Sequence, residues 1–187
     1  SEYSMQETIL LQTQYTGNNE RFTQSAKTEK GFILLSAELL VQLDKLGAET
    51  ARQNAEFEDG WRFISMQKIG SELFVLTQNR YDAAGAELRL FSADTFAQQE
   101  FTTDQAGMTG LGLCADGRLL LGDSQTIFAF TPETSEEETL LVWQELGVAD
   151  TSEQIWQTDS GFFFYTPNLS ALTVLRWMSG EALSKRI

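Results

Sequence analysis

The chain repeats one strand–turn–strand pattern four times within its 187 residues. The first strands of the four repeats are apolar: Gly31–Leu35, Leu73–Thr77, Leu119–Gly122 and Gly161–Tyr165. Their apolar cores begin at Phe32, Leu73, Leu119 and Phe162, which are 41, 46 and 43 residues apart. The second strands are Leu39–Leu43, Ala86–Phe91, Thr126–Phe130 and Leu172–Trp177. A period of about 40 to 50 residues with several strands in each unit is typical of blade-like repeats.

Each repeat has room for four short strands, so the sequence predicts an all-β fold, a β-propeller of four blades. We expect residues 1–187 to form a single domain in which the polar residues 1–8 are a frayed tail. The segment Ile9–Tyr15 precedes the first repeat, and we expect it to be a strand that closes the ring by pairing into the last blade. The alternative is a five-bladed propeller that lacks part of its last blade.

Three local predictions refine this outline. The second hairpin is predicted to have a longer turn at Asn79–Gly85. The charge run Glu136–Glu138 is predicted to be a solvated loop. The segment Leu35–Leu46 has apolar residues at helix-compatible offsets, but its place in the repeat favours a strand.

The charge balance limits the classes of partner. The chain has 27 acidic and 13 basic residues, a net charge of -14, which would repel a phosphate backbone or an anionic membrane surface. No apolar run approaches the roughly 20 residues of a membrane-spanning helix. The chain begins at Ser1 without a signal-peptide core, as a processed protein would. We therefore expect an extracytoplasmic protein that is periplasmic, secreted or anchored as a lipoprotein.

The residue types exclude several kinds of catalytic site. The chain has no histidine, which excludes Ser-His-Asp and Cys-His catalysis and all imidazole metal sites. Its one cysteine, Cys114, lies in the apolar strand Leu111–Ala115, where we expect a small core side chain. We expect neither a cofactor nor a metal.

Three stretches carry a resemblance to a known family. They are Phe-Thr-Gln-Ser-Ala at Phe22–Ala26, Gly-Leu-Gly-Leu-Cys-Ala-Asp-Gly at Gly110–Gly117, and Phe-Thr-Pro-Glu-Thr at Phe130–Thr134. With these stretches the chain resembles the plant-type glutaminyl cyclases, also called glutamine cyclotransferases. Members of that family are five-bladed propellers that convert an N-terminal glutamine to pyroglutamate and release ammonia.

The resemblance implies a set of site residues. Family members are thought to transfer a proton through the glutamate of a Phe-Gly-Glu-Gly motif. Phe57–Gly60 reads Phe-Glu-Asp-Gly, which implies Asp59 as the proton-transfer group. Phe22, Gln24 and Trp61 would then line the substrate pocket.

The chain departs from the family at most positions that carry the reaction. Alignment by the hairpin at Leu73 puts Ile64 at the position of the family's glutamate, and Gln78 at that of a family tryptophan. Thr109–Leu111 and Ser152–Gln154 replace two further family motifs. We therefore favour a non-enzymatic binding or scaffold module with a protein or peptide partner, descended from a glutaminyl-cyclase-like ancestor. The alternative is a divergent glutaminyl-peptide cyclotransferase. The aromatic candidates for partner contact are Tyr81, Trp61 and Trp143.

Overall fold

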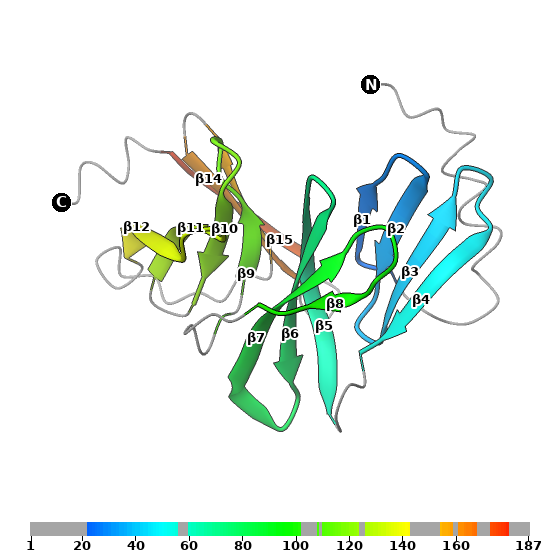
Figure 1. Ribbon diagram of the computed structural model, residues 1–187. Helices are drawn as coiled ribbons and strands as arrows, with labels where there is room; N and C mark the ends of the chain where they lie inside the picture. The colour runs from blue at the N-terminus through cyan, green and yellow to red at the C-terminus, as the bar shows by residue number, and fades with distance from the viewer. Residues whose placement is uncertain are drawn as a thin grey trace.

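A computed structural model of the chain describes residues 22–55, 60–101, 108, 110–123, 126–142, 154–158, 161–167 and 173–179. The regular secondary structure of these residues is β-strand (Figure 1). The predicted tail, residues 1–8, and the predicted closing strand, Ile9–Tyr15, lie outside the described residues. The number of blades therefore stays a prediction.

The first repeat forms an antiparallel sheet, sheet one. Its strands are β1 (Gln24–Lys27), β2 (Gly31–Leu35), β3 (Leu39–Asp44) and β4 (Glu49–Asn54), hydrogen-bonded in that order. The segment Leu35–Leu46 is a strand and turn rather than a helix. The reason is that sheet one is covered on both faces: Leu40 packs on one face, whereas Leu39 and Val41 pack on the other.

The second repeat forms sheet two, with the same strand order. Its strands are β5 (Trp61–Ile69), β6 (Glu72–Asn79), β7 (Asp82–Ser92) and β8 (Gln98–Gln99). The predicted long turn at Asn79–Gly85 is wrong, because β6 continues to Asn79 and β7 already begins at Asp82. A register shift between Gln78 and Asn79 lets the ladder continue. The Asn79 side chain then tightens the turn, since its Oδ1 accepts a hydrogen bond of 2.9 Å from the Tyr81 backbone N–H.

The last two repeats are joined in a seven-stranded sheet, sheet three. Its strands are β9 (Gly110–Leu113), β10 (Leu119–Gly122), β11 (Thr126–Thr131), β12 (Glu136–Val142), β13 (Gln154–Thr158), β14 (Gly161–Pro167) and β15 (Thr173–Ser179). The connection is a parallel pairing in which Gln154 of β13 lies opposite Leu111 of β9. All other pairings in sheet three are antiparallel.

The predicted loop at Glu136–Glu138 is wrong, because these residues begin β12. Glu136 pairs with Thr131, and Glu138 pairs with Ala129. The three glutamates are exposed although they belong to a strand, since β12 is the outermost strand of its half of sheet three. Charged residues on an edge strand also discourage pairing with another chain.

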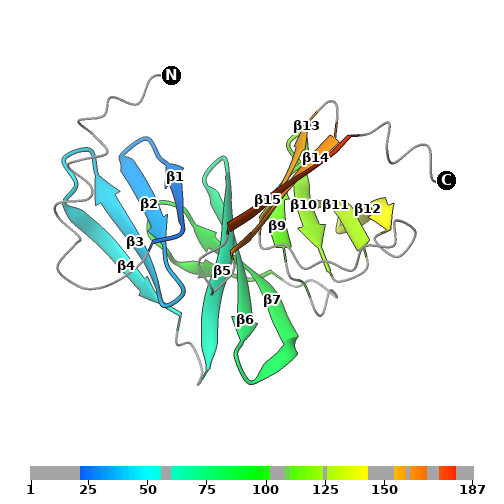
Figure 2. The ribbon, with the colours of Figure 1, turned by 180° about the vertical axis from the view of Figure 1, so that it is seen from behind.

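The first strands of the repeats lie next to one another. β5 packs beside β1 and beside β9, and β13 pairs with β9. Figures 1 and 2 show the sheets following one another in chain order, from β1–β4 through β5–β8 to β9–β15.

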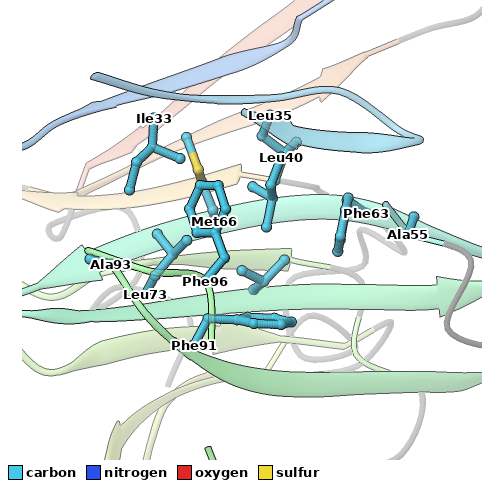
Figure 3. Close-up of a cluster of buried hydrophobic side chains, with 11 residues drawn as sticks. Ile33, Leu35, Leu40, Ala55, Phe63, Met66, Leu73, Phe91, Ala93 and Phe96 are labelled. Atoms are coloured by element: carbon cyan, nitrogen blue, oxygen red, sulfur yellow. The ribbon is translucent and has the colours of Figure 1, made fainter. Parts of the chain in front are cut away.

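Two apolar cores fill the spaces between neighbouring sheets. The first core cluster, between sheets one and two, comprises Ile33, Leu35, Leu40, Ala55, Phe63, Met66, Leu73, Val75, Phe91, Ala93 and Phe96 (Figure 3). The second, between sheets two and three, comprises Phe74, Leu76, Ala86, Leu88, Leu90, Met108, Leu111, Leu119, Leu121, Phe128 and Phe130. The pleat of β6 sends Leu73 and Val75 into the first cluster and Phe74 and Leu76 into the second. A continuous apolar run is therefore what a strand between two cores requires.

Candidate functional site

The turns gather at two opposite ends of the sheets. At one end β5 begins, and the β2–β3 and β6–β7 turns are joined by an ion pair of 3.3 Å between Arg80 and Glu38. We call it the Tyr81 end, after the exposed aromatic of the β6–β7 turn. The other is the Leu46 end, which carries the β3–β4 turn. In Figure 1 the β3–β4 turn and the β6–β7 turn point in opposite directions.

Tyr81 is exposed, and its backbone N–H is fixed in the turn by the Asn79 side chain. Its side chain is 75% exposed, and its ring lies against the backbone of Gly60. A Cβ added to Gly60 would be 2.6 Å from two ring carbons, so any other residue at this position would displace the ring. The Gly60 carbonyl accepts a hydrogen bond of 2.9 Å from the Arg80 backbone N–H, which fixes the start of β5 against the turn. The Tyr81 end thus presents an aromatic ring on a defined support.

Trp61 has a packing role instead. It is 6% exposed, and the guanidinium carbon of Arg89 lies 4.9 Å from the centre of its ring. Arg89 is held in turn by an ion pair of 2.9 Å with Glu87. Of the three aromatic candidates for partner contact, Tyr81 is therefore exposed, Trp61 is buried, and Trp143 lies outside the described residues.

Gln24 connects sheets one and two. Its Nε2 donates a hydrogen bond of 2.9 Å to the Ser65 Oγ, and its Oε1 accepts one of 2.9 Å from the Met66 backbone N–H. Both ends of the amide are thus engaged across the boundary between the sheets. Gln42 makes a second such connection, because its Nε2 donates to the Ala93 carbonyl at 3.3 Å.

The residues of the predicted pocket contact different parts of the protein. Phe22 packs against Leu39, Val41 and Leu43, on the face of sheet one that points away from sheet two. Gln24 reaches β5 at Ser65, about 13 Å along the strand from Trp61 at a rise of roughly 3.3 Å per residue. Asp59 lies outside the described residues. A role of these four residues in substrate binding or catalysis stays a prediction.

Sequence reasoning missed one polar pair at the Tyr81 end. The Nη2 of Arg62, at the start of β5, donates a hydrogen bond of 2.7 Å to the Oε1 of Gln78, at the end of β6. Their sequence separation gives no sign of the contact, which depends on the pairing of β5 with β6. An arginine between Trp61 and Phe63 in an acidic chain is the available signal.

Other site chemistries find little support in the described residues. They hold no group of three or more acidic or cysteine side chains that could bind a metal ion. Burial raises the pKa of the Cys114 thiol to about 11, so this cysteine is a poor nucleophile near neutral pH. The same part of the chain contains no helix long and apolar enough to cross a membrane.

Comparison with solved structures identifies the fold as a β-propeller. The chain is similar to virginiamycin B lyase from Staphylococcus aureus, with a TM-score of 0.55 and 11% identity over 89% of this chain. It is also similar to a chain of a nidogen/laminin complex, with a TM-score of 0.53 and 11% identity over 83% of this chain. A third neighbour is the Dos1 propeller, with a TM-score of 0.52 and 10% identity over 81% of this chain.

This chain spans 59%, 56% and 43% of the length of those three proteins, in the same order. At such identities the likeness shows the fold alone. No family model matches the chain, and no curated protein matches it in sequence.

Proposed function

We propose that this chain is a non-enzymatic β-propeller module that binds a protein or peptide partner through the Tyr81 end. The observation that carries the proposal is the exposed ring of Tyr81, which lies against Gly60. Tyrosine is enriched among the residues that dominate binding energy, because it supplies a large amphipathic contact area with only two side-chain torsions to fix.

Descent from a glutaminyl-cyclase-like propeller is part of this proposal. It is supported by the fit of Gly110–Gly117 to one hairpin: the apolar part forms β9, and Gly117 takes the positive φ of 91° in the turn that follows. We further propose that the chain works as a single domain outside the cytoplasm. Export of a tagged precursor from its native host would test the location.

The alternative function is a divergent glutaminyl-peptide cyclotransferase with Asp59 as proton-transfer group. The contacts of Gln24 favour the binding module, because its amide already has two partners within the protein and would have to leave them to hold a substrate. Incubation with a glutaminyl dipeptide tests the alternative directly. We expect no ammonia release. Turnover that Asp59→Asn abolishes would establish the cyclotransferase instead.

Site-specific crosslinking tests the binding module. A photoreactive residue at position 81 is compared with one at position 46, because Leu46 is 77% exposed and lies at the opposite end. We expect one partner to be captured from position 81 and not from position 46. With that partner purified, Tyr81→Ala should weaken binding about tenfold or more, whereas Leu46→Ala should leave it within about twofold. Equal effects of the two variants would contradict the proposal.

A further inference from the structure

Arg62 differs from the other arginines whose side chains the structure describes. The others each form an ion pair at 3.3 Å or less: Arg52 with Glu49, Arg80 with Glu38, Arg89 with Glu87, and Arg118 with Asp116 and Glu138. With the residues that the structure describes, Arg62 forms no ion pair, and its side chain donates a hydrogen bond to Gln78. The chain has 27 acidic and 13 basic residues, so an arginine without a carboxylate partner among the described residues needs an explanation.

The surroundings of Arg62 make the absence of a carboxylate partner energetically unfavourable. Its side chain is half-buried, and its Nε, like that of the ion-paired Arg89, is fully buried without a hydrogen-bond acceptor. Since side chains alternate along β5, Arg62 points to the opposite side from Trp61 and Phe63, toward the second core cluster. A guanidinium that is partly removed from water and has no anion loses hydration without an ionic interaction in return. An anionic ligand would supply an ionic interaction at the Nη groups of the guanidinium, since the buried Nε is out of its reach.

Gln78 complements Arg62 as a donor. Because the Oε1 of Gln78 accepts the hydrogen bond from Arg62, the two N–H groups of its Nε2 remain as donors beside the guanidinium. A guanidinium together with an amide NH2 offers several N–H donors, which suits the two oxygens of a carboxylate. The net charge of -14 favours a singly charged carboxylate over a doubly charged phosphate.

We propose that Arg62 and Gln78 form a binding site for a carboxylate group at the Tyr81 end, on the side of sheet two that faces sheet three. The carboxylate can belong to a small acid or to the C-terminus of a peptide. The inference rests on the proposed function only in assigning the site to the binding end, and it can be tested without a protein partner.

The test follows the Nε–H signal of Arg62 by NMR while N-acetylalanine is added. The amide of N-acetylalanine, which lacks the carboxylate, is the matched probe, and inorganic phosphate is the third. We expect a saturable shift of the Arg62 signal with N-acetylalanine alone. No saturable shift, or equal shifts with the amide or with phosphate, would overturn the proposal. A peptide with a free C-terminus that binds about tenfold more tightly than N-acetylalanine would identify the peptide as the source of the carboxylate.

Three variants separate a ligand role from a structural one. Arg62→Gln should weaken binding of N-acetylalanine about tenfold or more, because charge-assisted hydrogen bonds are lost. Arg80→Gln changes the charge equally at the same end but affects an arginine already paired with Glu38, and it should leave binding within about twofold. Arg62→Met should leave the thermal stability of the free protein unchanged or higher, since it removes a buried unpartnered N–H. A marked loss of stability would assign Arg62 a structural role and contradict the proposal.

Tyr81→Ala keeps the failures of the two proposals apart. It should weaken binding of the purified partner about tenfold or more while the response of Arg62 to N-acetylalanine persists. Loss of both in this variant would show that the site at Arg62 depends on Tyr81, against the inference.

Discussion

The ring of Tyr81 rests on Gly60, at a place where no other residue would fit. Gly60 has a φ of 88°, a conformation that L side chains rarely adopt, and the Tyr81 ring occupies the space that a Cβ would need. Two independent reasons thus require glycine at the entrance to β5. The residue against which the exposed ring lies is therefore 21 positions before Tyr81 in the sequence.

Gly60→Ala is expected to destabilise the protein and to displace Tyr81. The backbone strain costs about 1–2 kcal/mol, and the clash with the ring adds to it. Gly117→Ala is the matched control, because Gly117 has nearly the same φ, 91°, but no atom within 4 Å of the added Cβ. Chemical denaturation should show a loss in both variants, whereas the NMR signals of the Tyr81 ring should shift in Gly60→Ala alone. An unchanged ring environment in Gly60→Ala would contradict the contact.

Gln24→Leu is expected to lower the free energy of unfolding by about 2 kcal/mol. The substitution removes two hydrogen bonds between sheets one and two and leaves the Met66 N–H without its acceptor. Gln53→Leu is the control, because Gln53 is half-buried but its side chain donates its hydrogen bond to the carbonyl of its own neighbour, Asn54, and not to another sheet. Its effect should stay within about 0.5 kcal/mol in urea denaturation. Equal effects of the two variants would contradict the conclusion that Gln24 stabilises the contact between sheets one and two.

Phe74→Ala is expected to cost about 3–5 kcal/mol, because it opens a cavity in the second core cluster. The Phe74 side chain is buried and makes an edge-to-face contact with Phe101, with 5.7 Å between ring centres. Leu46→Ala serves as the exposed control and should change stability by less than about 0.5 kcal/mol. A loss below about 1 kcal/mol for Phe74→Ala in thermal or chemical unfolding would show that sheets two and three do not share this core.

The thiol of Cys114 predicts a pH dependence in the alkaline range. Burial, and to a lesser degree the negative charge of Asp116, raises its pKa from 9.0 to about 11. The folded state therefore holds the thiol proton more tightly than the unfolded state. This contribution to stability is complete below pH 9.0 and is lost as the pH rises toward 11.

Unfolding of the wild type and of Cys114→Ser, measured at intervals from pH 8 to 11.5, checks this pH dependence. The wild type should lose more stability than the variant across this range. Parallel curves would show that the thiol does not titrate in this way. Alkylation of the native thiol should likewise stay slow at pH 8 and become fast only in denaturant, because the thiolate is the reactive form.

The sequence predicts the strands well because their signal is local. The run Leu73–Leu76 requires burial on both sides, and a strand between two cores provides it. The glutamates of β12 were misassigned because charge indicates exposure, and an outermost strand is exposed while remaining a strand. The turn after Asn79 is shorter than its composition indicates, because the Oδ1 of Asn79 accepts a hydrogen bond from the Tyr81 backbone N–H and closes it.

The site is less predictable because its contacts are distant in the sequence. Gln24 and Ser65 are 41 positions apart, and only the packing of β1 beside β5 brings them together. Arg62 and Gln78 meet through the register of β5 and β6. Glycine at position 60 can be read from the sequence as a turn, but the identity of the ring above it cannot.

The parallel pairing of β9 with β13 has a consequence for how the protein opens. Sheets one and two meet mainly through side chains, with a backbone hydrogen bond from the Phe63 N–H to the Ala37 carbonyl, whereas the third and fourth repeats share a ladder of backbone hydrogen bonds. Separation of those two repeats must break that ladder, so they should exchange their amide hydrogens as one cooperative unit. The amides of Leu111–Leu113 and Gln154–Trp156 should therefore report a common opening energy, distinct from that of β1–β4. The repeats have similar spacings in the sequence, but we expect them to open in unequal groups.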